Sequence, residues 1–179
     1  VRFAENDSGV ASILASDPAF HAHPFLLQDC VSGRGQGVFA LYDHGKPLAF
    51  FAHRRLREKP PRGGVSVLSE SVPPDPLLLS YARSLLDKAG WHGIAMVEFK
   101  VSDDGAPYLM EINTRFWGSL QLAVDAGVDF PWLLYQMACG EPVDPVQDYK
   151  TGIRLRGGVG DLDSVYLLRR DGEGSGGEE

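Results

Sequence analysis

The sequence has few cysteines, no long apolar run and no excess of positive charge, and each absence argues against a class of protein. Cys30 and Cys139 lack metal-ligand spacing and are expected to be small buried hydrophobic residues rather than a disulfide. No run approaches the length of a transmembrane helix, and no basic-then-apolar secretory signal opens the sequence. A net charge of −7 argues against general nucleic-acid affinity. We therefore expect a cytoplasmic protein without a membrane or nucleic-acid partner.

A stretch beyond the middle of the chain has the pattern of a tight β-hairpin with acids on one face. Asp104-Gly105 is a residue pair that a two-residue type I′ turn prefers. With that turn Glu98 faces Glu111, because the numbers of paired residues have a constant sum in an antiparallel pair. Side chains alternate along a strand, so Asn113 shares the face of Glu111. The hairpin therefore predicts three oxygen ligands in one place.

Two carboxylates that face each other at about 5 Å are unfavourable unless one is protonated or a cation lies between them. Carboxylate and amide oxygens are ligands that Mg²⁺ accepts, and Arg115 adds a positive fork suited to a phosphate. The alternative is that both glutamates are solvent-facing strand residues. In the predicted register Val101 faces Tyr108, and the opposite face is expected to be apolar and packed, with Val97, Phe99, Val101, Met110 and Ile112.

The metal and phosphate end of the ATP-grasp superfamily, as in biotin carboxylase and the carbamoyl-phosphate synthetase large subunit, is similar to two runs of this sequence, MVEFK and LMEINTRFWGS. The resemblance implies that Glu98, Glu111 and Asn113 hold the magnesium ions of ATP, with Mn²⁺ as an alternative. It implies that Arg115 steadies the reacting phosphate or acyl phosphate. The implied fold class is α+β: the C-terminal lobe of the ATP-grasp fold, a mostly antiparallel sheet flanked by helices.

The apolar run from Phe25 to Val31 is β-like and is followed by a glycine-rich loop, Ser32–Gly37, and a strand, Val38–Tyr42. By resemblance the end of the first strand is the hinge between two lobes, whose backbone reads the adenine edge. The residues that match this hinge are Gln28, Asp29, Cys30 and Val31. The family commonly places an acid just after the hinge for the ribose hydroxyls, whereas this chain has Arg34 and Gly35 there.

A short basic cluster, residues 53–57, follows the next predicted strand, Pro47–Ala52. It comes before a Gly/Pro loop at residues 60–66. Such a cluster is commonly a solvated face, but the free N–H groups of the loop are suited to an anion. The resemblance places this segment beside the phosphates and the acceptor carboxylate, so Arg54 and Arg57 are candidate anion contacts. Alternation along the strand places Arg55 on the opposite face from Arg54.

The remaining patterns predict a scaffold of helices and one short strand. Asp75-Pro76 is a helix start, and apolar spacing continues to Gly90. Further helices are expected around residues 8–14 and at 118–126 and 130–139, the last capped by Asp129. Residues 153–156 alternate like a strand with one buried face. Trp132 is expected to be a packing residue, whereas packing and ligand contact remain open for Trp117.

The resemblance divides the chain into three parts. Residues 1–24 match the tail of the small ATP-grasp lobe, residues 25–170 match the metal- and nucleotide-binding lobe, and residues 171–179 are expected to be disordered. None of the first 29 residues is a lysine, although the family's small lobe supplies lysines to the ATP phosphates. We therefore expect the chain to be the C-terminal portion of a longer protein, with N-terminal domains as its partners and little activity alone.

The leading hypothesis is the ATP- and Mg-binding part of a carboxylate–amine or related ligase that acts through an acyl phosphate. Its substrates would be ATP and a small carboxylate whose identity the sequence does not give. Two alternatives remain open: a non-catalytic nucleotide-binding or assembly module, and a small-molecule kinase.

Overall fold

The computed structural model describes residues 2–59, 64–146, 148–158, 163 and 166–167, and the chain divides into two compact units. Unit 1, Val1–Val31, holds two helices, α1 (Asp7–Ser16) and α2 (Ala19–Ala22). Asn6 caps α1, because its side-chain oxygen accepts a hydrogen bond from the N–H of Gly9 at 2.9 Å. The helix expected around residues 8–14 is therefore confirmed, with slightly wider bounds.

Unit 2, Ser32–Glu179, is built on a six-stranded antiparallel sheet with the strand order β5-β4-β1-β2-β3-β6. The glycine-rich segment and the basic cluster both lie inside long strands, because backbone pairing continues through them. The strands are β1 (Arg34–Asp43), β2 (Lys46–Lys59), β3 (Val65–Ser71), β4 (Gly93–Val101), β5 (Pro107–Asn113) and β6 (Arg154–Arg156).

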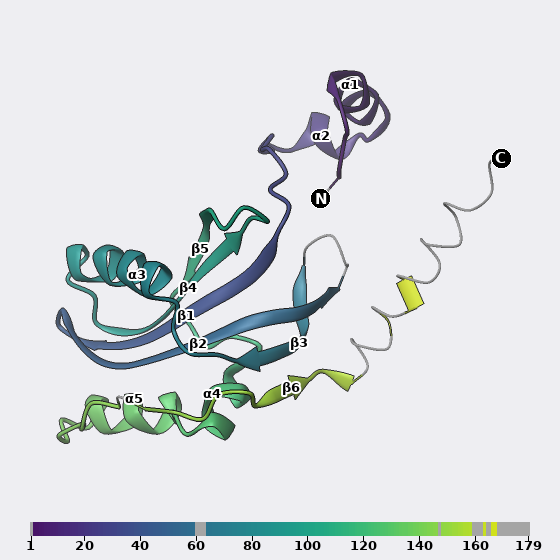
Figure 1. Ribbon diagram of the computed structural model, residues 1–179. Coiled ribbons are helices and arrows are strands. Elements are labelled where there is room, and N and C mark those ends of the chain that lie inside the picture. The colour runs from purple at the N-terminus through teal and green to yellow at the C-terminus, as the bar shows by residue number, and fades with distance from the viewer. Residues whose placement is uncertain (1, 60–63, 147, 159–162, 164–165, 168–179) are drawn as a thin grey trace. The chain divides into compact units, whose positions relative to one another are not determined.

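Helices cover both faces of this sheet, as the ribbon shows for α3 on one side and α4 and α5 on the other (Figure 1). The first face packs its apolar strand residues against α3 (Pro76–Lys88). The second face packs against α4 (Leu120–Ala126) and α5 (Phe130–Ala138), with Trp117 in the same core. The predicted α+β class, with an antiparallel sheet flanked by helices, is confirmed.

The helix starts predicted at Asp75 and Asp129 are also confirmed, and each has a side-chain cap. Asp75 accepts hydrogen bonds from the backbone N–H groups of Leu77 and Leu78, and Pro76 follows it in the first turn. Asp129 accepts from the N–H of Trp132 at the start of α5. These caps fix where α3 begins after β3 and where α5 begins after α4.

Two expectations about the first predicted strands are wrong. Residues 25–31 form no regular strand, and the side chains of Phe25, Leu26 and Leu27 are 46%, 85% and 73% exposed. An apolar run becomes a strand only where another strand pairs with it, and these residues pair with none of the described strands. The expected loop Ser32–Gly37 is mostly strand, because β1 begins at Arg34.

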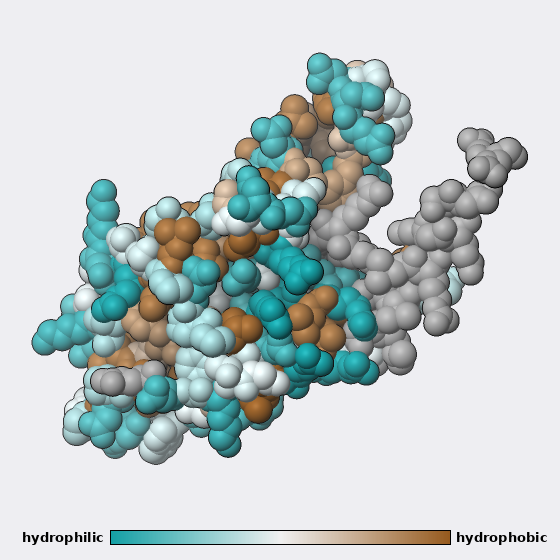
Figure 2. Space-filling model, viewed as in Figure 1, coloured by the Kyte–Doolittle hydropathy of each residue, from teal (hydrophilic) through white to brown (hydrophobic). Residues whose placement is uncertain are grey.

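The apolar face predicted for the hairpin is buried on β4 but not on β5. Val97 is fully buried and Phe99 is 2% exposed beneath α3, whereas Met110 and Ile112 are 57% and 38% exposed. The reason is that β5 is an edge strand beyond the reach of α3. Figure 2 shows brown, apolar atoms on the surface over the position of β5.

Two other expectations can be compared with the structure, and a third cannot. Both cysteines are exposed, so the expectation that they are buried is wrong, and neither forms a disulfide. Within the described ranges no helix is both long and apolar enough to cross a bilayer. The predicted disordered segment, residues 171–179, lies outside the described residues.

Candidate metal and phosphate site

Glu98 and Glu111 face each other across β4 and β5, as the sequence predicts, and we call them the acid pair. Met96 pairs with Asn113 in the same ladder, so Asn113 lies on the face of the acid pair two residues further along β5. The side-chain N–H of Asn113 donates to a carboxylate oxygen of Glu111 at 2.7 Å. The structure therefore brings together all three predicted metal ligands.

The turn that produces this register is different from the predicted one. The N–H of Ser102 donates to the carbonyl of Ala106, and the N–H of Gly105 donates to the carbonyl of Ser102, both at 2.9 Å. Gly105 has φ +88°, whereas Asp104 is not among the described residues with positive φ. The loop is therefore a three-residue turn with glycine in the left-handed position, not a two-residue type I′ turn. Asp104 stabilises it by accepting hydrogen bonds from the Ser102 hydroxyl and the Ala106 N–H.

A β-bulge restores the pairing of the two acids. Next to the loop, Val101 faces Pro107 rather than Tyr108, so the predicted pairing is wrong at that point. The register then shifts by one residue between Glu98 and Phe99, because Met110 is an extra residue on β5. The predicted pairing of Glu98 with Glu111 is thus correct, although the turn type and the uninterrupted ladder behind it are not.

The arginine that reaches the acid pair is Arg55 rather than Arg54. The Arg55 guanidinium lies 2.5 Å from a carboxylate oxygen of Glu98 and donates to the carbonyl of Gly64 at 3.0 Å. Arg54, on the other face of β2, makes two hydrogen bonds to Glu70, at 2.8 and 2.6 Å. The structure does not place Arg54 in the lining of the cavity described below, so the geometry favours Arg55 as the anion contact.

Arg57, the other candidate for an anion contact, is half-buried on β2. It lies where the pairing of β2 with β3 is irregular on both sides of it. It has an interaction partner. The structure does not bring it into the lining of the cavity, and its role in nucleotide binding stays a prediction.

Two glycines on β1 give the side chains of β2 room to lie toward β4. A Cβ atom on Gly37 would lie 3.0 Å from His53 Nε2, and one on Gly35 would lie 2.7 Å from Arg55 Cδ. Gly37 pairs with Glu98 on one side and with His53 on the other, so the three share one face of the sheet. Gly35 and Gly37 therefore leave this face of β1 without side chains between β2 and β4.

His53 is a functional candidate that the sequence reasoning left inside the basic cluster. Its side chain is 2% exposed, and its Nδ1 lies 3.1 Å from the hydroxyl of Ser119. Burial, followed by the nearby charge of Arg55, lowers the pKa of His53 from 6.5 to about 3. The ring is therefore neutral near pH 7, and its Nε2 has no hydrogen-bond partner.

Trp117 closes the same region from the loop after β5. Its ring is 5% exposed and lies against Phe39 and Phe130, with ring centroids 4.4 and 5.3 Å away. The sequence left open whether Trp117 packs in the core or contacts a ligand, and the geometry is compatible with both. The indole is a core residue, and its Nε1 is a buried donor without a partner.

A cavity of about 220 Å³ is lined by the acid pair, Arg55, His53 and Trp117. Among the described residues, the buried side-chain nitrogen and oxygen atoms without a hydrogen-bond partner are Nε2 of His53, Nε of Arg55, Oε2 of Glu98 and Nε1 of Trp117. All four residues line the cavity, and buried polar atoms normally have partners. The lining also includes Asn113, Arg115, Ser119 and Met96.

The electrostatics of the acid pair suit a cation. Burial raises the pKa of Glu98, the charge of Arg55 opposes this shift, and Glu111 adds to it. Oε2 of Glu98 is a buried acceptor without a partner, and the oxygens of Glu111 and Asn113 share its face. A hard divalent cation would meet carboxylate and amide oxygens here, so the residues present fit Mg²⁺.

Arg115 follows the acid pair on the loop after β5 and lines the same cavity. Its side chain is exposed, and its guanidinium donates to the carbonyl of Phe116 at 3.0 Å. The predicted hinge residues Gln28, Asp29, Cys30 and Val31 belong to unit 1, and their contact with adenine stays a prediction.

Comparison with solved structures shows that this chain shares a fold with parts of known carboxylases. A biotin carboxylase–β-γ-ATP complex from Campylobacter jejuni superimposes with a TM-score of 0.60 at 19% identity, over 86% of this chain and 37% of that one. Rhizobium etli pyruvate carboxylase with acetyl coenzyme A gives 0.57 at 18%, over 79% and 16%. The biotin carboxylase domain of Hydrogenobacter thermophilus 2-oxoglutarate carboxylase, with MgADP, ADP and bicarbonate, gives 0.51 at 20%, over 68% and 28%.

The chain thus spans 16–37% of the length of these three proteins. No curated protein sequence matches it. A family model described as "ATP-grasp in the biosynthetic pathway with Ter operon" matches residues 21–158, which include β1 to β6, the acid pair, Asn113 and Arg115. The chain belongs to this family of ATP-grasp proteins.

Proposed function

We propose that this chain is the metal- and phosphate-binding lobe of an ATP-dependent carboxylate ligase that acts through an acyl phosphate. The observation that carries the proposal is the cavity beside the acid pair, where four buried polar atoms lack partners. Buried polar atoms normally have hydrogen-bond partners, so these four atoms are available to a bound ligand or to water. Membership of the ATP-grasp family supports a nucleotide as part of that ligand.

The nucleotide side of the cavity would be formed by Glu98, Glu111 and Asn113, which would hold a divalent cation with the phosphates of ATP. Bound there, Mg²⁺ neutralises charge on the phosphate oxygens. Arg55 and Arg115 supply two further positive charges in the lining. Such an arrangement acts by positioning and electrostatic stabilisation, which dominate phosphoryl transfer.

The acceptor side would be formed by His53 and Trp117. When the Ser119 hydroxyl donates to Nδ1 of His53, the proton of the neutral ring lies on Nε2, which then faces the cavity as a donor. The indole Nε1 of Trp117 is a second neutral donor in the same lining. Two neutral N–H groups can orient a carboxylate oxygen without holding the acyl phosphate by charge. The carboxylate would attack the γ-phosphorus and displace ADP, which gives the acyl phosphate. An amine or similar nucleophile would then attack the acyl carbon and displace phosphate.

The first test is calorimetric titration of the chain with Mg²⁺-ADP and Mg²⁺-ATP. We expect Glu111→Ala to weaken nucleotide binding at least about tenfold, or about 1.4 kcal/mol. Glu141→Ala is the matched control, because Glu141 is an exposed acid after α5 and outside the cavity lining. Equal affinities in both variants would contradict the metal assignment.

The second test separates a ligase from a kinase in the protein with all its domains. Candidate carboxylates are incubated with ATP and hydroxylamine, which traps an acyl phosphate as a hydroxamate. Hydroxamate and ADP formed together support the ligase. A stable phosphorylated product that hydroxylamine does not consume supports the kinase alternative instead.

A further inference from the structure

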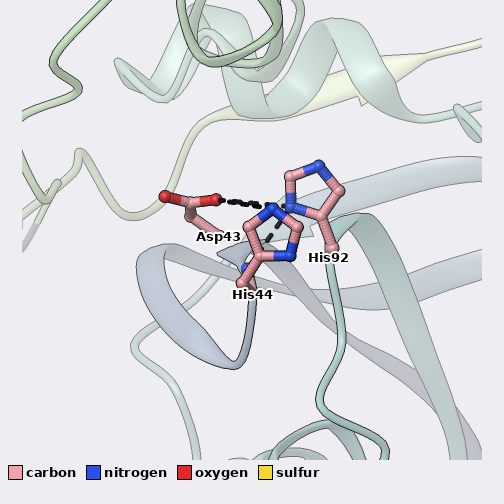
Figure 3. A group of neighbouring side chains, drawn as sticks. All are labelled: Asp43, His44 and His92. Atoms are coloured by element: carbon pink, nitrogen blue, oxygen red, sulfur yellow. Dashed lines mark hydrogen bonds and ion pairs between the residues drawn. The ribbon is translucent and has the colours of Figure 1, made fainter. Parts of the chain in front are cut away.

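A second cluster of metal-binding side chains lies at the other end of β4 from the acid pair. It consists of Asp43 and His44, at the turn between β1 and β2, and His92, just before β4 (Figure 3). Gly93, which follows His92, lies five positions before Glu98, or about 16 Å along an extended strand. The cluster therefore cannot share a ligand with the acid pair.

The backbone holds the two segments of this cluster together. The N–H of Gly45 donates to the carbonyl of Trp91 at 2.7 Å, which fixes the turn against the residue before His92. His44 has φ +44°, and no other non-glycine residue in the described ranges has a positive φ. Its ring stacks on that of His92, with centroids 4.1 Å apart and planes 14° apart. Both imidazoles are thus placed beside one carboxylate.

The potential ligand atoms already have spacings close to those of a metal site. Oδ1 of Asp43 lies 3.4 Å from Nδ1 of His92 and 3.8 Å from Nε2 of His44. One potential ligand atom from each residue lies within 4.8 Å of those of the other two. In a tetrahedral zinc site with bonds of about 2.0–2.1 Å, neighbouring ligands lie about 3.4 Å apart. The side chains are 46–81% exposed, so the two rings are free to turn out of their stack and direct one nitrogen lone pair each at a shared ion.

The hydrogen-bond geometry of His92 gives a second argument. Its Nδ1 faces both the N–H of His44, at 3.3 Å, and the carboxylate of Asp43. A neutral ring nitrogen can accept from the amide or donate to the carboxylate, but not both. A cation between the three side chains would use the lone pair of Nδ1 and the charge of Asp43 together, and the exposed His44 amide would then bond to water.

We propose that Asp43, His44 and His92 bind a borderline divalent cation of the zinc type. Two imidazoles and one carboxylate suit Zn²⁺ better than Mg²⁺, which prefers oxygen ligands. Three protein ligands leave the fourth position to water or to a donor from another molecule. The bound cation links the β1–β2 turn to the segment between α3 and β4, so it stabilises the end of the sheet away from the acid pair.

The test is calorimetric titration of the chain with ZnCl₂ in excess Mg²⁺, which occupies the acid pair. The variants are His44→Asn, which keeps a residue that tolerates positive φ, and His92→Gln. We expect each to weaken zinc binding at least about tenfold. The matched control is His21→Gln/His23→Gln, which removes two exposed histidines of unit 1 and should leave the affinity unchanged.

Co²⁺ absorption provides an independent measurement on the same proteins. Intense d–d bands of tetrahedral Co²⁺ in the wild type and the control, but not in the two cluster variants, would support the site. The proposal is overturned if the wild type binds no zinc, if both cluster variants bind it as tightly as the wild type, or if the control loses it. Circular dichroism verifies that each variant is folded, and Asp43→Asn replaces any variant that is not.

Discussion

The buried neutral histidine should make the stability of unit 2 depend on pH. The pKa of His53 is about 3 in the folded chain, against 6.5 for an ordinary histidine. Between these values the unfolded chain binds a proton that the folded chain does not. The free energy of unfolding therefore falls as the pH falls from about 6.5 to about 3.

The magnitude follows from the difference in pKa. One pKa unit corresponds to about 1.4 kcal/mol, so the whole window corresponds to an upper bound of about 5 kcal/mol. Between about pH 7 and about pH 5 the loss from His53 alone is about 2 kcal/mol. Glu98 acts in the opposite direction, because its raised pKa makes the folded chain bind more protons as the pH falls. A comparison with His53→Gln removes this second effect, since both proteins contain Glu98.

The assay is urea unfolding at both pH values, followed by tryptophan fluorescence. Trp91, Trp117 and Trp132 all lie in unit 2, so the signal reports the unit that contains His53. We expect the wild type to lose about 2 kcal/mol more than His53→Gln between the two pH values. Losses equal to within about 0.5 kcal/mol would refute the reasoning. If the variant does not fold, NMR titration of His53 in the wild type gives the same test, because the ring should not titrate above about pH 4.

Three further predictions concern packing and chemistry. Gly37→Ala should lower the free energy of unfolding by about 1–3 kcal/mol, because the added Cβ would crowd two ring systems. Gly118→Ala adds a Cβ in open space and should change that free energy by less than about 0.5 kcal/mol. Urea unfolding measures both. Phe130→Ala should lower the free energy of unfolding by about 3–5 kcal/mol, because Phe130 is fully buried in the core. Trp132 is 53% exposed, so Trp132→Ala should lower it by less than about 1 kcal/mol in the same assay. Arg115→Ala should reduce ligase turnover at least about tenfold with little change in stability, and turnover within about threefold of the wild type would remove its proposed role.

The sequence predicts the acid pair from alternation along a strand and a turn near Gly105, and the pairing is correct because the bulge at Met110 compensates for the longer turn. It does not predict the neighbours of the pair, because they depend on which strands lie side by side. Gly37 lies between Glu98 and His53 only because β1 pairs with both β4 and β2. No local pattern contains that pairing, so His53 could not be separated from the basic residues that follow it.

The choice between Arg54 and Arg55 shows the same limit. Alternation correctly places them on opposite faces, but only the sheet order decides which face carries the acid pair. The opposite error occurred at residues 25–31, where an apolar run suggested a strand. Without a partner strand in the described part of the chain, apolar character alone does not make one.

The bulge at Met110 shifts the pairing of β5 with β4 by one residue, and the strand without the bulge would have a different register. Without the bulge, Met110 would face Glu98, while Glu111 would face Val97 and turn toward α3. Strand β5 is an edge strand with β4 as its single neighbour, and the two facing carboxylates disfavour the bulged register when no cation lies between them. A cation that requires both carboxylates stabilises only the bulged register. Loading the site should therefore slow hydrogen exchange along the whole of β5, well beyond the residues that touch the cation.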